Sequence, residues 1–161
     1  MTPSLSQFCQ GGLAGTLRLE YAYHADVDPD SLYTIVSPQW NRPYDVIFLE
    51  GDWQTLPVLR VPRWQETMSS NSQGNVYTHQ VIAQVRQLSA GASAVFDAIS
   101  RRRLLLRITD YEGRTFITGN REQAFRLAYV RQAGGNGQYG GYRVTITGQT
   151  SHSTTAYNPF V

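Results

Sequence analysis

The stretch RRRLLLRITDYEGRTFITGN, residues 101–120, decides the fold, because it holds two apolar runs on either side of a short polar corner. One interpretation is a site in which Asp110 and Glu112 act as ligands or catalysts beneath an arginine cluster. The other is a strand, a turn and a second strand, because Asp at the first position and Gly at the last position of DYEG are typical of a β-turn. A calcium loop needs more oxygen ligands, at alternating positions, than this segment carries. We therefore predict a hairpin.

Period-two alternation recurs along the rest of the chain. Residues 17–23 place leucine and tyrosine on one face and Arg18, Glu20 and Ala22 on the other, and residues 44–50 (YDVIFLE) predict a more buried strand. Because side chains alternate across a strand, each segment offers one apolar face to a shared core. The pattern predicts a mainly β fold, an antiparallel β-sandwich or barrel. In residues 76–88 the predicted core face consists of Tyr77, His79, Val81, Ala83 and Val85.

One segment breaks the strand pattern. Residues 89–102 (SAGASAVFDAISRR) are rich in alanine and carry Val95, Phe96 and Ile99 at helical spacing. Ser93 is suited to cap a helix start, and arginines suit the negative end of the helix dipole. We predict one short flanking helix over about residues 92–102.

The length of 161 residues is sufficient for one hydrophobic core, so we expect a single β-rich domain over residues 1–161. An extended N-terminal arm is expected over about residues 1–15, and a polar C-terminal tail over about residues 149–161. Residues 131–143 (RQAGGNGQYGGYR) predict a glycine-dense hairpin tip between two strands.

The net charge of the chain is small, but its basic residues are all of one type. The formal net charge is +2, and all 14 basic residues are arginine. Arginine forks to carboxylates and stacks on aromatic rings, which suits protein interfaces, although a GC-rich genome produces the same bias. No apolar run approaches the roughly 20 residues of a spanning helix, so we expect a soluble chain with no membrane span.

No pattern of reactive side chains predicts catalysis. The three histidines are far apart, Cys9 is the single cysteine and has no basic neighbour, and no nucleophile elbow of the G-x-S-x-G kind is present. Residues 101–103 are three arginines, which suit either a solvated helix end or the carboxylates of a neighbouring subunit. We expect no enzyme activity, no metal site and no cofactor.

Four features follow one another along the chain: CQGGLAGTLRLEYA (9–22), GNVYTHQVIAQV (74–85), a helix leading into a D-x-x-G hairpin (110–113) and GYRVTITG (141–148). This order resembles virion structural proteins of tailed phages and prophages of the Bacteroidetes type, of the tail-tube or tail-associated kind. The resemblance covers most of the chain and is one of strand and turn pattern, whereas residues 42–62 have no counterpart in it.

The resemblance implies a sandwich flanked by one helix and stacked as rings into a hollow tube for DNA passage. It implies copies of the chain and other virion tail proteins as partners, DNA as a non-specific passenger, and a location in the virion tail after synthesis in the host cytoplasm. The alternative is a carbohydrate-binding β-sandwich module, because Trp40, Trp53 and Trp64 are suited to stack on sugar rings.

Several stretches are aromatic or basic yet too irregular or too rich in glycine for a core, and these are expected to be buried between subunits. The candidate subunit-interface residues are Phe8, Cys9, Arg101, Arg102, Tyr139, Tyr142, Tyr157 and Phe160.

Overall fold

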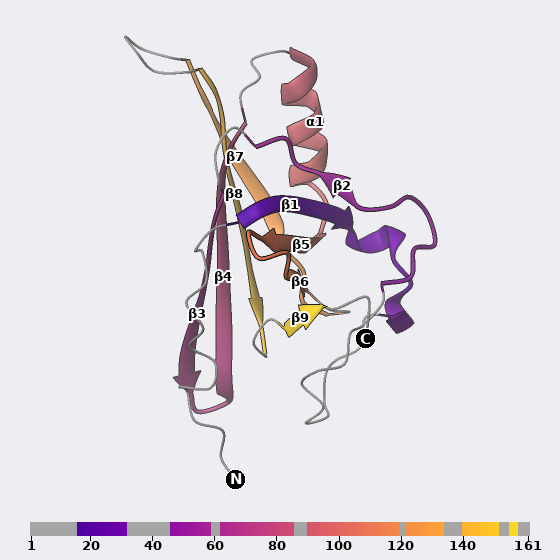
Figure 1. Ribbon diagram of the computed structural model, residues 1–161, viewed down its shortest axis with the longest axis vertical. Helices are drawn as coiled ribbons and strands as arrows, with labels where there is room; N and C mark the ends of the chain where they lie inside the picture. Colours follow the sequence, from indigo (N-terminus) through magenta and orange to yellow (C-terminus); the bar gives the residue numbers. More distant parts are fainter. Residues whose placement is uncertain are drawn as a thin grey trace.

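The protein is an open antiparallel β-sandwich with one helix, which confirms the predicted fold class and selects the sandwich over a closed barrel (Figure 1). The computed structural model describes residues 16–31, 46–58, 62–85, 90–119, 122–133, 140–151 and 155–157. The first sheet has the strand order β2 (Gln54–Thr55), β1 (Thr16–Tyr23), β5 (Leu104–Asp110), β6 (Thr115–Thr118) and β9 (Thr155–Tyr157). The second sheet has the order β3 (Arg63–Asn71), β4 (Gly74–Val85), β8 (Gly141–Thr150) and β7 (Arg126–Gln132).

The hairpin predicted from residues 101–120 is confirmed as β5 and β6. The backbone N–H of Gly113 donates to the carbonyl of Asp110 at 3.1 Å, and the N–H of Asp110 donates to the carbonyl of Arg114 at 2.9 Å. Gly113 has a φ of 79°, a left-handed conformation that glycine adopts without steric cost. This corner is a turn.

The main core lies between the two sheets. The predicted core face of β4 is confirmed at His79, Val81, Ala83 and Val85, which are buried while the residues between them are exposed or half-buried. Tyr77, the fifth member of the predicted face, is only half-buried. Across the core, Leu106 and Ile108 of β5 are fully buried. Burying each such aliphatic side chain contributes roughly 1.5–3 kcal/mol.

Helix α1 (Ala90–Ser100) packs on the core side of the second sheet. Phe96 lies 4.9 Å from the ring of Tyr142, between ring centroids, and Ile99 is buried beside it. The helix begins and ends two residues earlier than predicted, and Ser93 is inside it, where its hydroxyl contacts the hydroxyl of Tyr142 rather than capping the start. Across the described residues no helix has the length and apolarity to cross a membrane.

Residues 24–31 and 46–53, here called the outer corner, cover part of the first sheet on the side away from the core. This corner contains the 3-10 helices η2 (His24–Asp26) and η3 (Pro29–Ser31), and Val27 forms a β-bridge with Phe48. Val27 packs with Leu105 of β5, supported by Phe48 and Trp53.

The buried strand predicted over residues 44–50 is wrong for the part that the structure describes. Residues 46–50 form an irregular segment whose successive side chains point in and out, so that Ile47 and Leu49 are 56% and 69% exposed. Residues 44–45 lie outside the described part of the chain. On β1 the face opposite the leucines and tyrosines is also largely buried, since Glu20 and Ala22 are each 2% exposed.

The start predicted for the C-terminal tail, at about residue 149, is too early in the chain. β8 continues to Thr150, which is buried, and β9 pairs with β6 through Phe116 and Ala156. Residues 149–150 and 155–157 therefore belong to the two sheets. The N-terminal arm (1–15) and the last four residues lie outside the described part of the chain.

We predict that Gly148→Ala lowers the free energy of unfolding by about 1–3 kcal/mol, as overpacking of a dense core does. A Cβ at this position would lie 2.7 Å from Cδ1 of Phe125, a ring that is fully buried. Chemical denaturation measures the change. Thr147→Ala, on the exposed side of the same strand, is the control and should stay within about 0.5 kcal/mol of the parent. Equal stability of Gly148→Ala and the parent would contradict the packing.

Candidate assembly surfaces

The two sheets differ in how their edges end. The edge strands of the first sheet are very short, with two residues in β2 and three in β9. Those of the second sheet are longer, with nine residues in β3 and seven in β7. Short edge strands are one of the devices by which proteins prevent edge-to-edge pairing. Among the described residues, the outermost strands of the second sheet are therefore the longer ones.

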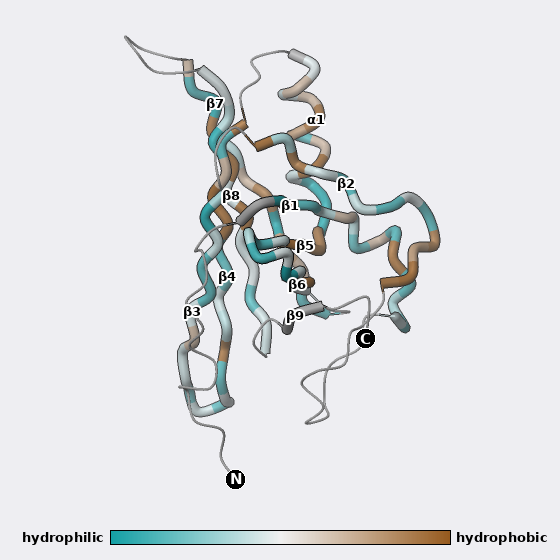
Figure 2. The backbone as a smooth tube through the Cα atoms, viewed as in Figure 1, coloured by the Kyte–Doolittle hydropathy of each residue, from teal (hydrophilic) through white to brown (hydrophobic). Residues whose placement is uncertain are grey.

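The hairpin of β3 and β4 projects beyond the rest of the sandwich (Figure 1). Its register is continuous from Arg63 paired with Ile82 to Asn71 paired with Gly74. β8 pairs with β4 only as far as Tyr77, so residues 69–76 form a two-stranded ribbon. This ribbon is mostly polar, as its colouring shows (Figure 2).

The second sheet also leaves one of its faces uncovered by the other described elements. We call this surface the open face, and most of its side chains are exposed. Strand alternation and register determine which residues belong to the open face, since each member lies beside another member on the neighbouring strand. Its residues are Arg63, Gln65, Thr67, Thr78, Gln80, Ile82, Gln84, Arg126, Ala128, Val130, Arg143, Thr145, Thr147 and Gln149.

The structure places the predicted interface residues in three different settings. Arg101 and Arg102 are exposed just after α1, and the guanidinium of Arg102 lies 4.4 Å from the centroid of the Tyr23 ring. Tyr157 is the last residue of β9, on the edge of the first sheet, with its backbone paired to Thr115. Phe8, Cys9, Tyr139 and Phe160 lie outside the described residues.

The assignment of Tyr142 to an interface is wrong. Its side chain is 1% exposed, and its ring packs against Phe96 and Tyr129 within the protomer. The neighbouring glycines suggested a hairpin tip, but Tyr142 already lies in β8, where it is paired with Val85 of β4.

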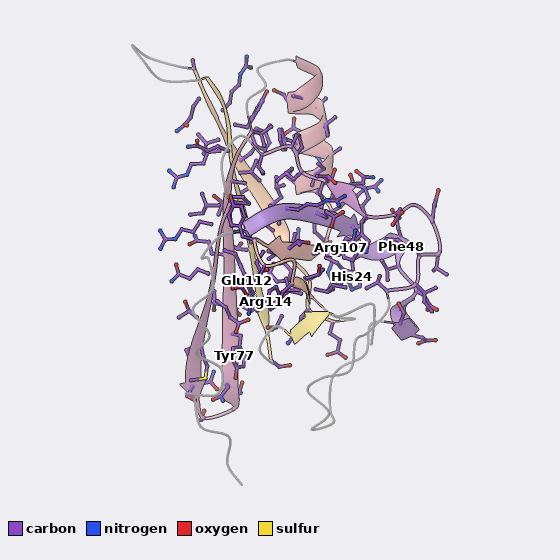
Figure 3. All side chains as sticks on the ribbon, in the orientation of Figure 1. His24, Phe48, Tyr77, Arg107, Glu112 and Arg114 are labelled. Atoms are coloured by element: carbon purple, nitrogen blue, oxygen red, sulfur yellow. The ribbon has the colours of Figure 1, made fainter. Side chains whose placement is uncertain are left out.

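A buried ion pair joins β1 and β5 within the first sheet, and sequence reasoning missed it. Glu20 accepts two hydrogen bonds from Arg107, at 2.7 and 2.8 Å, and forms an ion pair with Arg18 at 2.9 Å. The guanidinium of Arg107 lies 4.7 Å from the centroid of the Trp53 ring, on the side of the sandwich that also holds Phe48 (Figure 3). Glu20 and Arg107 are direct cross-strand partners although they are 87 positions apart. The Glu20 carboxylate is thus fully engaged by Arg107 and Arg18, and its role is structural.

Asp110 and Glu112 also have structural partners. The Asp110 carboxylate accepts the backbone N–H groups of Glu112 and Arg114, and it pairs with the Arg114 guanidinium at 2.8 Å. Partial burial acts to raise the pKa of Asp110, but the hydrogen bonds and positive charge of Arg114 together hold that pKa below its ordinary value. The carboxylate therefore stabilises the turn. No group of three or more metal-ligating side chains comes together among the residues that the structure describes.

The two described tryptophans are half-buried. Trp53 packs against Phe48 at 5.7 Å and beneath Arg107, and Trp64 packs against Phe116 at 5.4 Å, between ring centroids. A sugar platform needs an open ring face, and these contacts take up much of both rings. Trp40 lies outside the described residues.

Comparisons of the chain with protein-family models, with curated proteins and with solved structures find no match.

We predict that Asp110→Asn lowers the free energy of unfolding at pH 7 by about 1 kcal/mol, as loss of a charge-assisted hydrogen bond does. The carboxylate has a lowered pKa in the folded state, so its contribution is present above the unfolded value of 3.8 and is lost as the pH falls through the folded value. The difference between the parent and the variant should therefore shrink as the pH is lowered below 3.8 in a denaturation series. A constant difference across that series would contradict the assignment. Glu112→Gln, at an exposed pair, should change stability by less than about 0.5 kcal/mol.

We predict that Glu20→Ala costs about 2–3 kcal/mol, less than the roughly 3–5 kcal/mol of a fully buried broken pair. The reason for the smaller cost is that the Arg107 side chain is 26% exposed and keeps some water. The double variant Glu20→Met with Arg107→Met should recover most of the loss, because it leaves no buried charge unpaired. Thermal and chemical unfolding measure both variants. A neutral Glu20→Ala would contradict the role of the pair.

Proposed function

We propose that the chain is a non-enzymatic, self-assembling structural subunit of a phage or phage-like particle, of the tail-tube or tail-associated kind. The observation that carries self-assembly is the long, regular edge strand β3 on a sheet whose other edge, β7, is also long. The particle assignment rests on the resemblance in sequence pattern. The sandwich with one flanking helix agrees with what that resemblance implies.

The edge at β3 has little of the usual protection against strand addition over its second half. Proteins blunt edges with short strands, bulges, proline and charged side chains, lysine above all. β3 has nine residues, RWQETMSSN, with no proline or lysine, and its register to β4 has no interruption. Its two charged residues, Arg63 and Glu66, lie in its first half. A monomeric protein with such an edge risks uncontrolled aggregation, whereas an assembling subunit uses the edge as an interface.

The hairpin geometry sets which backbone groups of β3 point outward. The turn between β3 and β4 has two residues, so the flanking pair of Asn71 and Gly74 is hydrogen-bonded and the bonded pairs then alternate along the strands. The N–H groups of Ser70 and Met68 therefore point away from β4. Outward groups recur at steps of roughly 6.8 Å, which matches the ladder of an added antiparallel or parallel strand.

In this proposal, copies of the chain are the principal partners, and rings of them surround a channel. DNA passes through the channel without base-specific contacts, and other tail proteins bind at the ends of the tube. The protein accordingly resides in the virion tail after synthesis in the host cytoplasm. A sugar-binding module needs open aromatic platforms, and the packing of Trp53 and Trp64 gives that alternative no support.

We predict that Met68→Pro reduces self-association while leaving the fold intact. The N–H of Met68 points to the edge, so proline there removes an edge donor without removing a β3–β4 hydrogen bond. Met68 is 55% exposed, so little packing is lost. Light scattering across a concentration series should show association shifted to concentrations about tenfold higher, a loss of about 1.4 kcal/mol.

Met68→Thr is the matched control, because it removes the same side chain but keeps the backbone donor. It should associate as the parent does. If Met68→Pro and Met68→Thr associate equally, the edge of β3 is not an assembly surface.

A further inference from the structure

We propose that the open face of the second sheet binds the outer corner of a second copy of the chain, with arginines of one copy against carboxylates of the next. This inference rests on the proposed self-assembly and names a second contact within it. Both surfaces are made of described residues, and the evidence is their charge, their apolar content and their positions in the fold.

The open face is basic and contains no acidic residue among its described members. Its charges are Arg63 on β3, Arg143 on β8 and Arg126 on β7, and all three residues are exposed. With strand and residue spacings in a sheet, these positions lie roughly 12–16 Å apart, so the charge is spread across the whole face. Threonine and glutamine fill the space between them, and Val130 adds an apolar side chain that is 58% exposed.

The outer corner has the opposite character. Five of the 12 acidic residues of the chain lie in it, and neither of its two segments contains an arginine. Two of its most prominent apolar side chains, Ile47 and Leu49, are largely exposed among these acids. The acidic residues of the outer corner are Asp26, Asp28, Asp30, Glu50 and Asp52.

Each surface thus combines exposed apolar side chains with charges of one sign. A cluster of apolar side chains within a charged rim is the usual composition of a protein interface. Ile47 and Leu49 supply the apolar part on the outer corner, and Val130 with the half-buried Ile82 supplies it on the open face. Complementary charge at the rim gives register and faster association more than it gives affinity.

The two surfaces lie on opposite sides of the protomer. The outer corner packs on the first sheet through Val27 and Leu105, on the side away from the core, while the open face is the side of the second sheet away from the core. The second sheet and the outer corner accordingly appear at opposite margins of the molecule (Figure 1). The open face and the outer corner of one copy cannot contact each other, so each must bind a different copy. Such a contact is heterologous, and its repetition from copy to copy builds rings or filaments.

This contact is perpendicular to the one made at the edge of β3. An added strand extends the second sheet within its plane, whereas binding to the open face acts along the normal to that plane. A tube wall needs two independent directions of contact, one around the ring and one along the axis. The edge and the face of a single sheet supply these two directions.

Charge reversal tests the inference on the full-length chain. The face variant carries Arg126→Glu and Arg143→Glu, and the corner variant carries Glu50→Arg and Asp52→Arg. Each variant alone should need a concentration about tenfold or more above that of the parent to associate, because like charges then face one another. An equimolar mixture of the two variants should associate as the parent does, since each reversed surface finds its complement on the other protein.

The controls separate charge at the contact from net charge. Ala94→Glu with Ala98→Glu adds negative charge on exposed positions of α1 and should leave association unchanged. Association of the parent should also weaken from low to high salt, since contacts at an interface rim are screened. Light scattering and negative-stain microscopy give the readout, and circular dichroism checks that each variant is folded.

The outcomes distinguish this inference from the proposed function. If the parent associates and the face and corner variants associate equally well, the inference is overturned while self-assembly stands. If each variant fails and their mixture also fails, the surfaces do not contact each other and the inference is overturned. If the parent never associates, the proposed function fails and this inference fails with it.

Discussion

The register of β4 against β8 is the constraint on which the rest of the structure depends. The two strands pair without interruption from Tyr77 with Thr150 to Val85 with Tyr142. Because side chains alternate, this register turns Val81 and Ile146 into the core and leaves the intervening arginine, threonine and glutamine residues in water. A slip of one residue would exchange the two faces and place polar side chains in the core. The same pairing therefore fixes both the hydrophobic core and the chemistry of the open face.

The two sheets have different roles as a result. The first sheet has the core on one side, the outer corner over part of the other and short strands at its edges, so it closes the fold. The Glu20–Arg107 pair and the stacking of Arg107 on Trp53 hold the outer corner to it. The second sheet has one covered face, one open face and two long edges. What this sheet presents to its surroundings is the basis of the proposed assembly.

Local sequence pattern was sufficient to predict several of the strands and the turn, but it did not predict the edge strand β3, and the strand predicted over residues 44–50 is absent from its described part. The alternation in residues 76–88 assigned His79, Val81, Ala83 and Val85 to the core, and the DYEG spacing predicted the turn at Asp110. These features are encoded within a few residues. They can therefore be predicted without knowing which distant residues pack against them.

The errors arose where distant residues decide the outcome. Glu20 is buried because its partner Arg107 lies on another strand. Val46 and Phe48 are apolar because they pack over the first sheet, although residues 46–50 form no strand. Tyr142 was assigned to a glycine-rich tip because its packing partners, on α1 and β7, are not adjacent in sequence. Edge status and the open face likewise emerge only from pairing between distant strands, so no local pattern predicts them.

The most direct test of the central claim is the assembly state of the unmodified full-length chain. Light scattering over a broad range of concentrations at low salt, followed by negative-stain microscopy of the same samples, measures it. Self-assembly through the second sheet predicts a mass that rises with concentration and images of rings or hollow tubes. A protein that stays monomeric at every concentration would contradict the account.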